Sequence, residues 1–335
     1  STMSATKSQV METTMSPPAP RRRGGRVGNH FKRWWWVHLI IFIAVFLIIL
    51  LPVVYVAYPK IAQGDVNDST LNITSMVISN PMPDSFDLRQ TQVIGTHATF
   101  HPKIYAFEAA VSLLGAAVPF ANVMVPSVQS KNGAELVVEQ TVDLSNASAF
   151  GGYATAVMLN EEVTLNIYGK PGLKEGGLPK TTVTYNKTVA MKGLNKLKGF
   201  NVTEFHITNL GSGQNMNGTV LIPNPSVMTI TMGNITLDLS VGGQYMGQSY
   251  LNDLVLKPGN NFIPMTASIN QSAILNIVTS KNNPYKDGLV PFVITGNSSV
   301  YDGKELPYFT KALAANTLTV GLNVTKALAE FGVTL

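Results

Sequence analysis

An uncharged apolar stretch near the start of the chain, residues 34–59, most constrains what this sequence can form. As an α-helix at about 1.5 Å per residue, residues 37–57 would be roughly 31 Å long, close to the roughly 30 Å hydrocarbon core of a bilayer. Three tryptophans, Trp34 to Trp36, stand at one end, and Tyr55 and Tyr58 stand at the other. Aromatic residues concentrate at both membrane interfaces in this way. The sequence therefore predicts one transmembrane helix over residues 34–59.

The charges that flank this stretch predict its orientation. Residues 1–33 carry a net charge of +6, whereas the whole chain carries +5, so the remaining residues sum to −1. Positive charge gathers on the cytosolic side, which predicts a cytosolic tail and a type II signal anchor with residues 60–335 across the membrane. A cleaved signal peptide is the alternative, but its apolar region is about 7–15 residues long and ends in a small-residue cleavage site, which this run lacks.

The tail itself, residues 1–33, has few large apolar side chains and is expected to be disordered and basic. Its basic cluster serves as a topology signal and, as a second interpretation, as a contact for anionic lipid headgroups. A membrane-anchored tail without a folded module does not favour nucleic-acid binding. The residues of this cluster are Arg21, Arg22, Arg23, Arg26, Lys32 and Arg33.

Ten Asn-x-Ser/Thr sequons occur in the chain, all on the side of the apolar stretch that the charges place outside the cytosol. This agreement predicts a glycoprotein of the secretory pathway. A β-rich sequence with many Asn and Thr residues also produces sequons by chance, so about half of them are expected to have that origin. The candidate sites are Asn67, Asn72, Asn146, Asn186, Asn201, Asn217, Asn234, Asn270, Asn297 and Asn323.

No residue pattern points to catalysis. The chain has no cysteine, which excludes thiol catalysis and cysteine-ligated metals. His97 and His101 are spaced like a pair of metal ligands, but a β-prone segment would hold them about 13 Å apart, so we expect two surface histidines. The remaining histidines give no Ser-His-Asp triad, and no two carboxylates are placed together by the pattern. We expect no enzyme, no metal site, no catalytic residue and no cofactor.

Beyond the apolar stretch the sequence is patterned for β-structure. Val, Ile and Thr alternate with polar residues, and Gly, Pro and Asn interrupt the runs. Short helices are predicted over residues 147–159, 271–279 and 306–316.

A repeat of landmarks predicts two domains of similar build. In each half a strand, an Asn-Pro pair and further strands precede a turn, a strand ending near an Asn, a short helix and another strand. Asn80-Pro81 and Asn224-Pro225 are the first landmarks of the two halves. The sequence therefore predicts a mainly β protein with two tandem antiparallel β-sandwich domains, over residues 60–195 and 196–335.

The second half carries a family resemblance. Ile222-Pro-Asn-Pro225, the run Leu237-Asp-Leu-Ser-Val-Gly-Gly-Gln-Tyr-Met-Gly-Gln248 and Leu254-Val-Leu-Lys-Pro-Gly-Asn-Asn261 resemble the type 2 late-embryogenesis-abundant domain, also called the water-stress and hypersensitive-response domain. With the basic tail and the anchor, the whole layout resembles ascomycete fungal membrane proteins that carry this domain. The resemblance implies seven-stranded, immunoglobulin-like sandwiches without enzymatic activity. Some members of the family, at vacuolar or lysosomal membranes, are thought to hold lipid between their sheets.

One apolar segment, residues 105–118, is rich in small side chains. It is expected to form a pair of core strands or a hairpin, and its second interpretation is the wall of an apolar groove for acyl chains. The residues of this predicted groove are Tyr105, Phe107, Val111, Leu113, Leu114 and Val118.

Two functions remain open at this point. In the first, the domains bind or transfer lipid at the vacuolar or plasma membrane that anchors them. In the second, they are interaction or scaffold modules whose partner is a protein or a cell-wall polysaccharide. Nothing in the residues alone separates the two.

Overall fold

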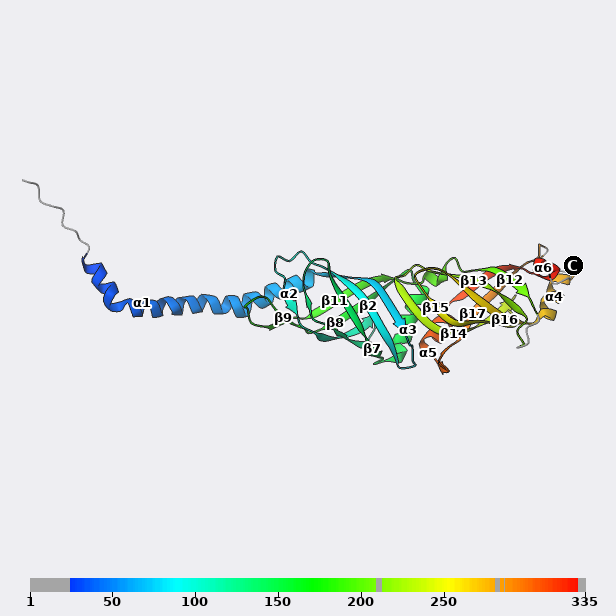
Figure 1. Cartoon of the computed structure of the whole chain (residues 1–335), viewed down its shortest axis with the longest axis horizontal. Helices are drawn as coiled ribbons and strands as arrows, with labels where there is room; N and C mark the ends of the chain where they lie inside the picture. Colours follow the sequence, from blue (N-terminus) through cyan, green and yellow to red (C-terminus); the bar gives the residue numbers. More distant parts are fainter. Residues whose placement is uncertain (1–24, 209–212, 281–283, 286, 331–335) are drawn as a thin grey trace, which may run out of the picture. The chain divides into compact units, whose positions relative to one another are not determined.

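The computed structural model describes residues 25–208, 213–280, 284–285 and 287–330, and its described side chains begin at Trp34 and end at Ala329. The chain divides into two compact units, residues 1–56 and 57–335. Each unit is considered by itself. The chain is mainly β, with one apolar helix near its start (Figure 1).

The first unit contains the apolar helix α1 (Gly25–Pro52), which passes into a π-helical turn, η1 (Val53–Ala57). The backbone of α1 is kinked at Trp34, where φ is −121°. Proline at position 52 lacks an N–H, which favours the change from α to π geometry next to it. Among the described residues this is the one helix long and apolar enough to cross a membrane. The structure thus has an apolar helix where the transmembrane helix was predicted, and this helix begins at Gly25 rather than at Trp34.

The second unit begins with helix α2 (Tyr58–Asp68), which the sequence did not predict. Its proline, at the first turn, is compatible with a helix start. Ala62 and Val66, four residues apart, lie on the same face and are buried. The first domain was predicted to begin at residue 60, and in the structure this helix fills the residues between that position and the first strand, β1 (Thr70–Ser79).

The first half of this unit, residues 70–192, contains two facing sheets and a smaller one. One sheet has the order β1-β2-β7, the facing sheet has the order β11-β8-β4-β5, and the small sheet has the order β10-β9-β3-β6. Side chains from the first two sheets meet in one interior, as in a β-sandwich. The strands are β1 (Thr70–Ser79), β2 (Ser85–Gly95), β3 (Lys103–Ile104), β4 (Phe107–Leu113), β5 (Ala121–Val125), β6 (Val128–Gln129), β7 (Ala134–Asp143), β8 (Glu162–Gly169), β9 (Gly172–Lys174), β10 (Thr181–Thr182) and β11 (Tyr185–Lys192).

The second half, residues 201–323, repeats this pairing. Order β12-β13-β16 corresponds to β1-β2-β7, and the pairs β15-β14, β14-β17 and β17-β19 correspond to β5-β4, β4-β8 and β8-β11. Here β15 also pairs with β16, so the two sheets are joined. The strands are β12 (Asn201–Ile207), β13 (Met216–Asn224), β14 (Met228–Val241), β15 (Gln244–Leu256), β16 (Gly259–Ile269), β17 (Leu289–Tyr301), β18 (Lys304–Glu305) and β19 (Thr317–Asn323).

The strand pairing shows that the two Asn-Pro pairs lie at different positions in the fold of the two halves. Asn80-Pro81 follows β1, whose hairpin partner is β2, whereas Asn224-Pro225 connects β13 to β14, which belong to different pairings. The amide of Asn224 donates to the carbonyl of Met228 and its oxygen accepts from the N–H of Ser226, which closes a local turn. Asn224 therefore stabilises a turn, and the two Asn-Pro pairs, which the repeat had matched, are not equivalent in the fold.

The short helices agree closely with their predicted ranges. They are α3 (Ala147–Leu159), α4 (Gln271–Thr279) and α5 (Pro307–Ala314), and a further helix, α6 (Val324–Glu330), follows β19. The side-chain oxygens of Asn146 and Asn270 accept from the N–H groups of Ala149 and Ala273, respectively. These bonds satisfy an amide that the first turn of a helix leaves unpaired, so each Asn fixes where its helix begins.

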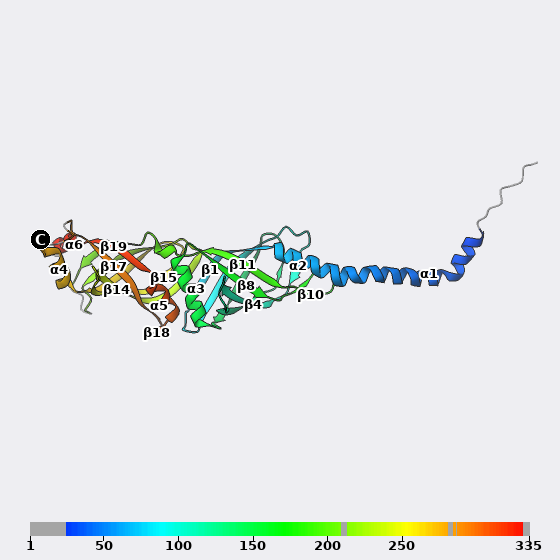
Figure 2. The ribbon, with the colours of Figure 1, turned by 180° about the vertical axis from the view of Figure 1, so that it is seen from behind.

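The two halves are joined by a parallel strand pair and by two helices. Met76, Val77 and Ile78 of β1 pair with Met228, Thr229 and Ile230 of β14. Helices α3 and α5 pack against each other beside this pair, where the ring of Phe150 meets the ring of Tyr308 edge-on at 4.8 Å. The Tyr308 hydroxyl donates to the carbonyl of Met82 at 2.8 Å. Figures 1 and 2 show α3 and α5 next to each other from both sides.

Candidate functional site

The candidate site lies between the two large sheets of the first half and depends on strand β2. Alternate residues of this strand, starting at Phe86 and ending at Ile94, are buried and face the interior. This is the two-residue period of a strand with one face in the core. Two of the inward positions hold Gln90 and Gln92, which are 7% and 6% exposed. Glutamine is rarely this buried, so the pair is unusual for a core.

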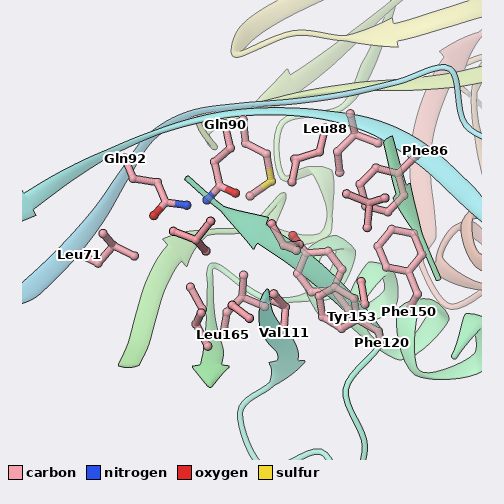
Figure 3. Close-up of a pocket in the computed structure, with 18 of the residues that line it drawn as sticks. Leu71, Phe86, Leu88, Gln90, Gln92, Val111, Phe120, Phe150, Tyr153 and Leu165 are labelled. Carbon is pink, nitrogen blue, oxygen red and sulfur yellow. The ribbon is translucent and has the colours of Figure 1, made fainter. Parts of the chain in front are cut away.

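A cavity of about 60 Å³ lies in front of these two side chains. Apart from the two amides and the hydroxyls of Tyr153 and Tyr185, its lining is aliphatic or aromatic, and no charged residue of the described chain contributes to it. Figure 3 shows both amides directed from β2 into the interior, toward Leu165 and Val111 on the facing sheet. The site is therefore an apolar cavity with a short polar stripe on one wall.

Neither amide forms a hydrogen bond to any group in the described part of the chain. In the described residues, the side-chain polar atoms that have neither solvent exposure nor a hydrogen-bond partner are oxygens of Glu175, Thr208 and Thr266. The amide atoms of Gln90 and Gln92 are not among them, so they retain some accessible surface. The amides thus face open space in the cavity. A buried polar group without a partner costs about 1–3 kcal/mol, so these amides call for a partner that enters the cavity.

A third glutamine shows what a satisfied amide looks like in the same sheet. Gln140 of β7 accepts from the N–H of Met124 and donates to the carbonyl of Met124, both at 3.2 Å. This side chain bridges the edges of the two facing sheets, β7 and β5. It does not line the cavity.

Aromatic rings close one end of the cavity. Phe150 of α3 lies 5.1 Å from Phe86 and 5.5 Å from Phe120, measured between ring centres. Tyr153 stacks on Phe120, and burial raises the pKa of its hydroxyl well above the ordinary range. Within the described chain this hydroxyl contacts the sulfur atoms of Met191 and Met228, each at 3.8 Å, and sulfur is a weak acceptor.

Toward the start of β1 and β11, the edge of the sandwich is tied to helix α2. The Gln63 amide donates to the carbonyl of Thr184 at 2.8 Å and accepts from its N–H at 2.7 Å. The Lys187 ammonium occupies an inward position of β11 and bonds to the carbonyls of Asn67 and Ser69 at the end of α2. Burial lowers the pKa of Lys187, and Asp68 opposes this shift. The positive charge lies at the C-terminal end of α2, where the helix dipole stabilises a cation.

The cavity approaches the surface where its lining residues are only half-buried. These residues are Leu71, Val111, Val125 and Tyr185. Burial raises the pKa of Tyr185 to about 12, and its ring lies 5.4 Å from that of Phe107.

The predicted groove residues do not all gather at this cavity. Residues 107–113 form a single strand, β4, which pairs with β5 after a connecting turn. Val111 lines the cavity, whereas Phe107 is buried in the core and Leu113 is half-buried beside it. Leu114 and Val118 stand on the turn and are 54% and 46% exposed. Tyr105 lies outside β4, with the ammonium group of Lys180 4.3 Å from its ring centre.

The other predicted site residues are placed as follows. Among the sequon asparagines, Asn146 and Asn217 are half-buried, and the side chains of the remaining eight are exposed. Arg21, Arg22 and Arg23 lie outside the described residues, while Arg26, Lys32 and Arg33 belong to α1 without described side chains. His97 and His101 are exposed in an irregular segment rather than in a strand. The described residues contain no group of three His, Asp or Glu side chains that could hold a metal ion.

A second cavity lies in the second half and is larger, about 220 Å³. Apolar side chains of β12, β13, β16, β17 and β19 line it, together with helices α4 and α6. Its polar lining, among the described residues, consists of Gln271 and Ser272, both exposed at the start of α4. It therefore lacks the buried amides of the first cavity.

Sequence reasoning missed Gln90 and Gln92. The available signal was the alternation itself, because both residues continue the inward series that Phe86 and Leu88 begin.

Comparison with known families gives one match. A family described as "Protein of unknown function (DUF3712)" matches residues 118–239, about a third of the chain. The match begins in the turn before β5 and ends inside β14, so it spans parts of both halves. No curated protein matches the sequence.

Several solved structures are weakly similar. The CupB6 tip adhesin from Pseudomonas aeruginosa is 7% identical, with a TM-score of 0.19, over 60% of this chain and 88% of the adhesin. The periplasmic chaperone SfaE is 8% identical, with a TM-score of 0.17, over 76% of this chain and 100% of the chaperone. An adhesin from Mobiluncus mulieris is 10% identical, with a TM-score of 0.19, over 76% of this chain and 98% of the adhesin. TM-scores this low support no conclusion about fold or function.

Proposed function

We propose that this chain is a non-enzymatic, single-pass membrane glycoprotein whose β unit binds or transfers lipid at the membrane that anchors it. The observation that carries the proposal is the apolar cavity between the sheets of the first half. Pockets for small molecules are mostly apolar, with a few placed polar groups, and this cavity has that composition.

The proposed architecture is a pair of immunoglobulin-like sandwiches related to the type 2 late-embryogenesis-abundant domain, as in ascomycete fungal membrane proteins. The strand pairing that recurs in the two halves supports this interpretation. The proposed topology is type II, with the basic tail in the cytosol and the β unit in the lumen of a vacuole or outside the plasma membrane. The apolar helix and the exposed positions of most sequon asparagines support it.

Binding of a lipid would require the first cavity to grow. Its volume of about 60 Å³ is well below the roughly 300–1,000 Å³ of small-molecule pockets. The facing sheets β1-β2-β7 and β11-β8-β4-β5 would have to move apart, with the half-buried side chains of Leu71 and Val111 as the first to shift. The second cavity, about 220 Å³, needs a smaller change but offers no buried polar group among its described lining residues.

The small volume of the first cavity favours one alternative, an interaction or scaffold module. A closely packed sandwich would then present its outer surface to a protein or a wall polysaccharide. Exposed aromatic residues such as Tyr245 and Phe262 suit such a contact.

Native mass spectrometry decides between these functions. The β unit, residues 57–335, can be studied alone because its buried core runs from Ala62 to Val324 and includes no residue of α1. It is expressed in a eukaryotic secretory host, deglycosylated and weighed, and any bound molecule is extracted and identified. A stoichiometric lipid supports the proposal, and an unchanged mass after incubation with mixed liposomes contradicts it in favour of the scaffold.

A pair of blocking variants locates the ligand. Val111→Trp narrows the mouth of the first cavity, and Leu275→Trp does the same for the second. Loss of the lipid in Val111→Trp alone is the expected result. Loss in Leu275→Trp alone would move the site to the second half.

A further inference from the structure

The amides of Gln90 and Gln92 have a consequence for what the cavity accepts. Each residue is more than nine-tenths buried, each is directed into the cavity, and neither has a hydrogen-bond partner in the described chain (Figure 3). Each amide offers two N–H donors and one carbonyl acceptor. The two side chains stand two residues apart on one strand, so their polar ends lie on the same wall.

The residues around the two amides argue against a ligand whose head group carries a charge. No Lys, Arg or His of the described chain lines the cavity, and the nearby ammonium of Lys187 is engaged by the carbonyls of Asn67 and Ser69. Burying a phosphate or carboxylate charge without a cation is far more costly than burying a neutral polar group. A neutral group that both donates and accepts, such as a hydroxyl, fits the amides without this cost.

We infer that the cavity selects an uncharged lipid through its polar end, a hydroxyl or carbonyl group hydrogen-bonded to Gln90 and Gln92, with the chain lying among the apolar side chains. The inference rests on the proposed function, since it names the class of lipid for that same cavity. Phospholipids with charged heads are excluded as ligands of this cavity.

Water is the competing occupant. A cavity of about 60 Å³ has room for a few water molecules at roughly 10–15 Å³ each, and water would satisfy the amides equally well. The test must therefore separate a bound head group from water, and it must also separate a failure of selectivity from a failure of lipid binding.

Three probes with the same ten-carbon chain achieve this: 1-decanol, decane and decyl phosphate. Their dissociation constants for residues 57–335 are measured by displacement of a fluorescent fatty probe and checked by native mass spectrometry. We expect 1-decanol to bind at least about tenfold more tightly than decane, the effect of one good hydrogen bond, and decyl phosphate to bind most weakly. This comparison uses the wild-type protein, so it does not depend on the folding of a variant.

The double variant Gln90→Met with Gln92→Met is expected to bind 1-decanol and decane equally, because methionine keeps the length of the side chain and removes its hydrogen bonds. Gln140→Met is the matched control, since its amide bonds to Met124 and does not line the cavity. It should keep the preference for 1-decanol.

The outcomes separate the two proposals. Equal binding of all three probes to the wild-type protein overturns the inference and leaves lipid binding intact. Binding of none of them, with ordered water on both amides in a crystal structure, removes both. A preference for 1-decanol that survives in the double variant overturns the role of the glutamines alone.

Discussion

Gln90 occupies a position where the strand period calls for an apolar side chain, and its amide has no partner in the described chain. In the ligand-free β unit we expect Gln90→Leu to raise the free energy of unfolding by about 1 kcal/mol, because it replaces a buried amide that has no partner in the described chain by an apolar side chain in an apolar cavity. Gln140→Leu is the control and should lower it by about 1 kcal/mol, because it breaks two hydrogen bonds to Met124. Urea denaturation measures both. Equal destabilisation by the two substitutions would mean that Gln90 is satisfied in the native state.

Tyr185 gives the β unit a dependence on alkaline pH. Burial raises the pKa of its hydroxyl to about 12, above the ordinary value of about 10. The unfolded chain therefore loses this proton first, so the stabilisation is complete below pH 10 and is lost as the pH rises to 12. The raised pKa values of Tyr153 and Tyr308 also decrease the stability as the pH rises, whereas the lowered pKa of Lys187 increases the stability as the pH rises.

The free energy of unfolding is expected to fall less steeply in Tyr185→Phe, by up to about 1.4 kcal/mol per pH unit between pH 10 and 12. The substitution removes the titrating hydroxyl and leaves the ring against Phe107. Urea denaturation at pH 9, 10, 11 and 12 measures the slope. Tyr168→Phe, at an exposed tyrosine, is the control. An unchanged slope in Tyr185→Phe would show that its hydroxyl titrates alike in both states.

At the scale of elements, helix α3 depends on a residue with two roles. Asn146 caps the helix through its side-chain oxygen and is also the asparagine of a sequon. Asn146→Ala should cost about 1 kcal/mol of stability, the usual value of a lost cap, and should remove any glycan. Ser148→Ala removes the sequon and keeps the cap, so it should not destabilise the unit. Thermal unfolding of the two variants, with a mass measurement for the glycan, separates the roles. Equal stability of the two would contradict the cap.

The helices also show what could be predicted from the sequence. The bounds of α3 and α4 agree with prediction because each helix follows an asparagine whose side-chain oxygen caps its first turn. Helix α2 was missed because it adjoins the apolar stretch and buries only Ala62 and Val66. Residues 105–118 were predicted to form a pair of core strands or a hairpin, whereas the structure has one strand over residues 107–113 and a turn that exposes Leu114 and Val118.

Contacts between segments that are far apart in the chain could not be predicted from the sequence. Nothing in the alternation of β1 indicates that it pairs with β14. In the same way the alternation of β2 marks Gln90 and Gln92 as inward, but only the facing sheet shows that their amides are left without partners in the described chain.

For the β unit as a whole, Phe150 links the two halves, since its ring contacts Phe86 and Phe120 on one side and Tyr308 on the other. Phe150→Ala should cost about 3–5 kcal/mol and should lower the stability of both halves in one cooperative transition. Calorimetry tests this, with Phe262→Ala, at a residue 62% exposed, as the control. Two separate transitions in the wild-type unit would show instead that the halves unfold independently.

The parallel pairing of β1 with β14 also has a consequence for the protein during its synthesis. Met228, the partner of Met76, is added to the growing chain 152 residues later. At about 5–20 residues per second, roughly 8–30 s pass before this edge of β1 can be covered. An open strand edge is prone to pair with other chains, so these seconds of synthesis are the period in which the protein is most exposed to aggregation. Asn72, an exposed sequon residue on β1, lies four residues before Met76, and a glycan added there during synthesis would shield the edge until β14 arrives.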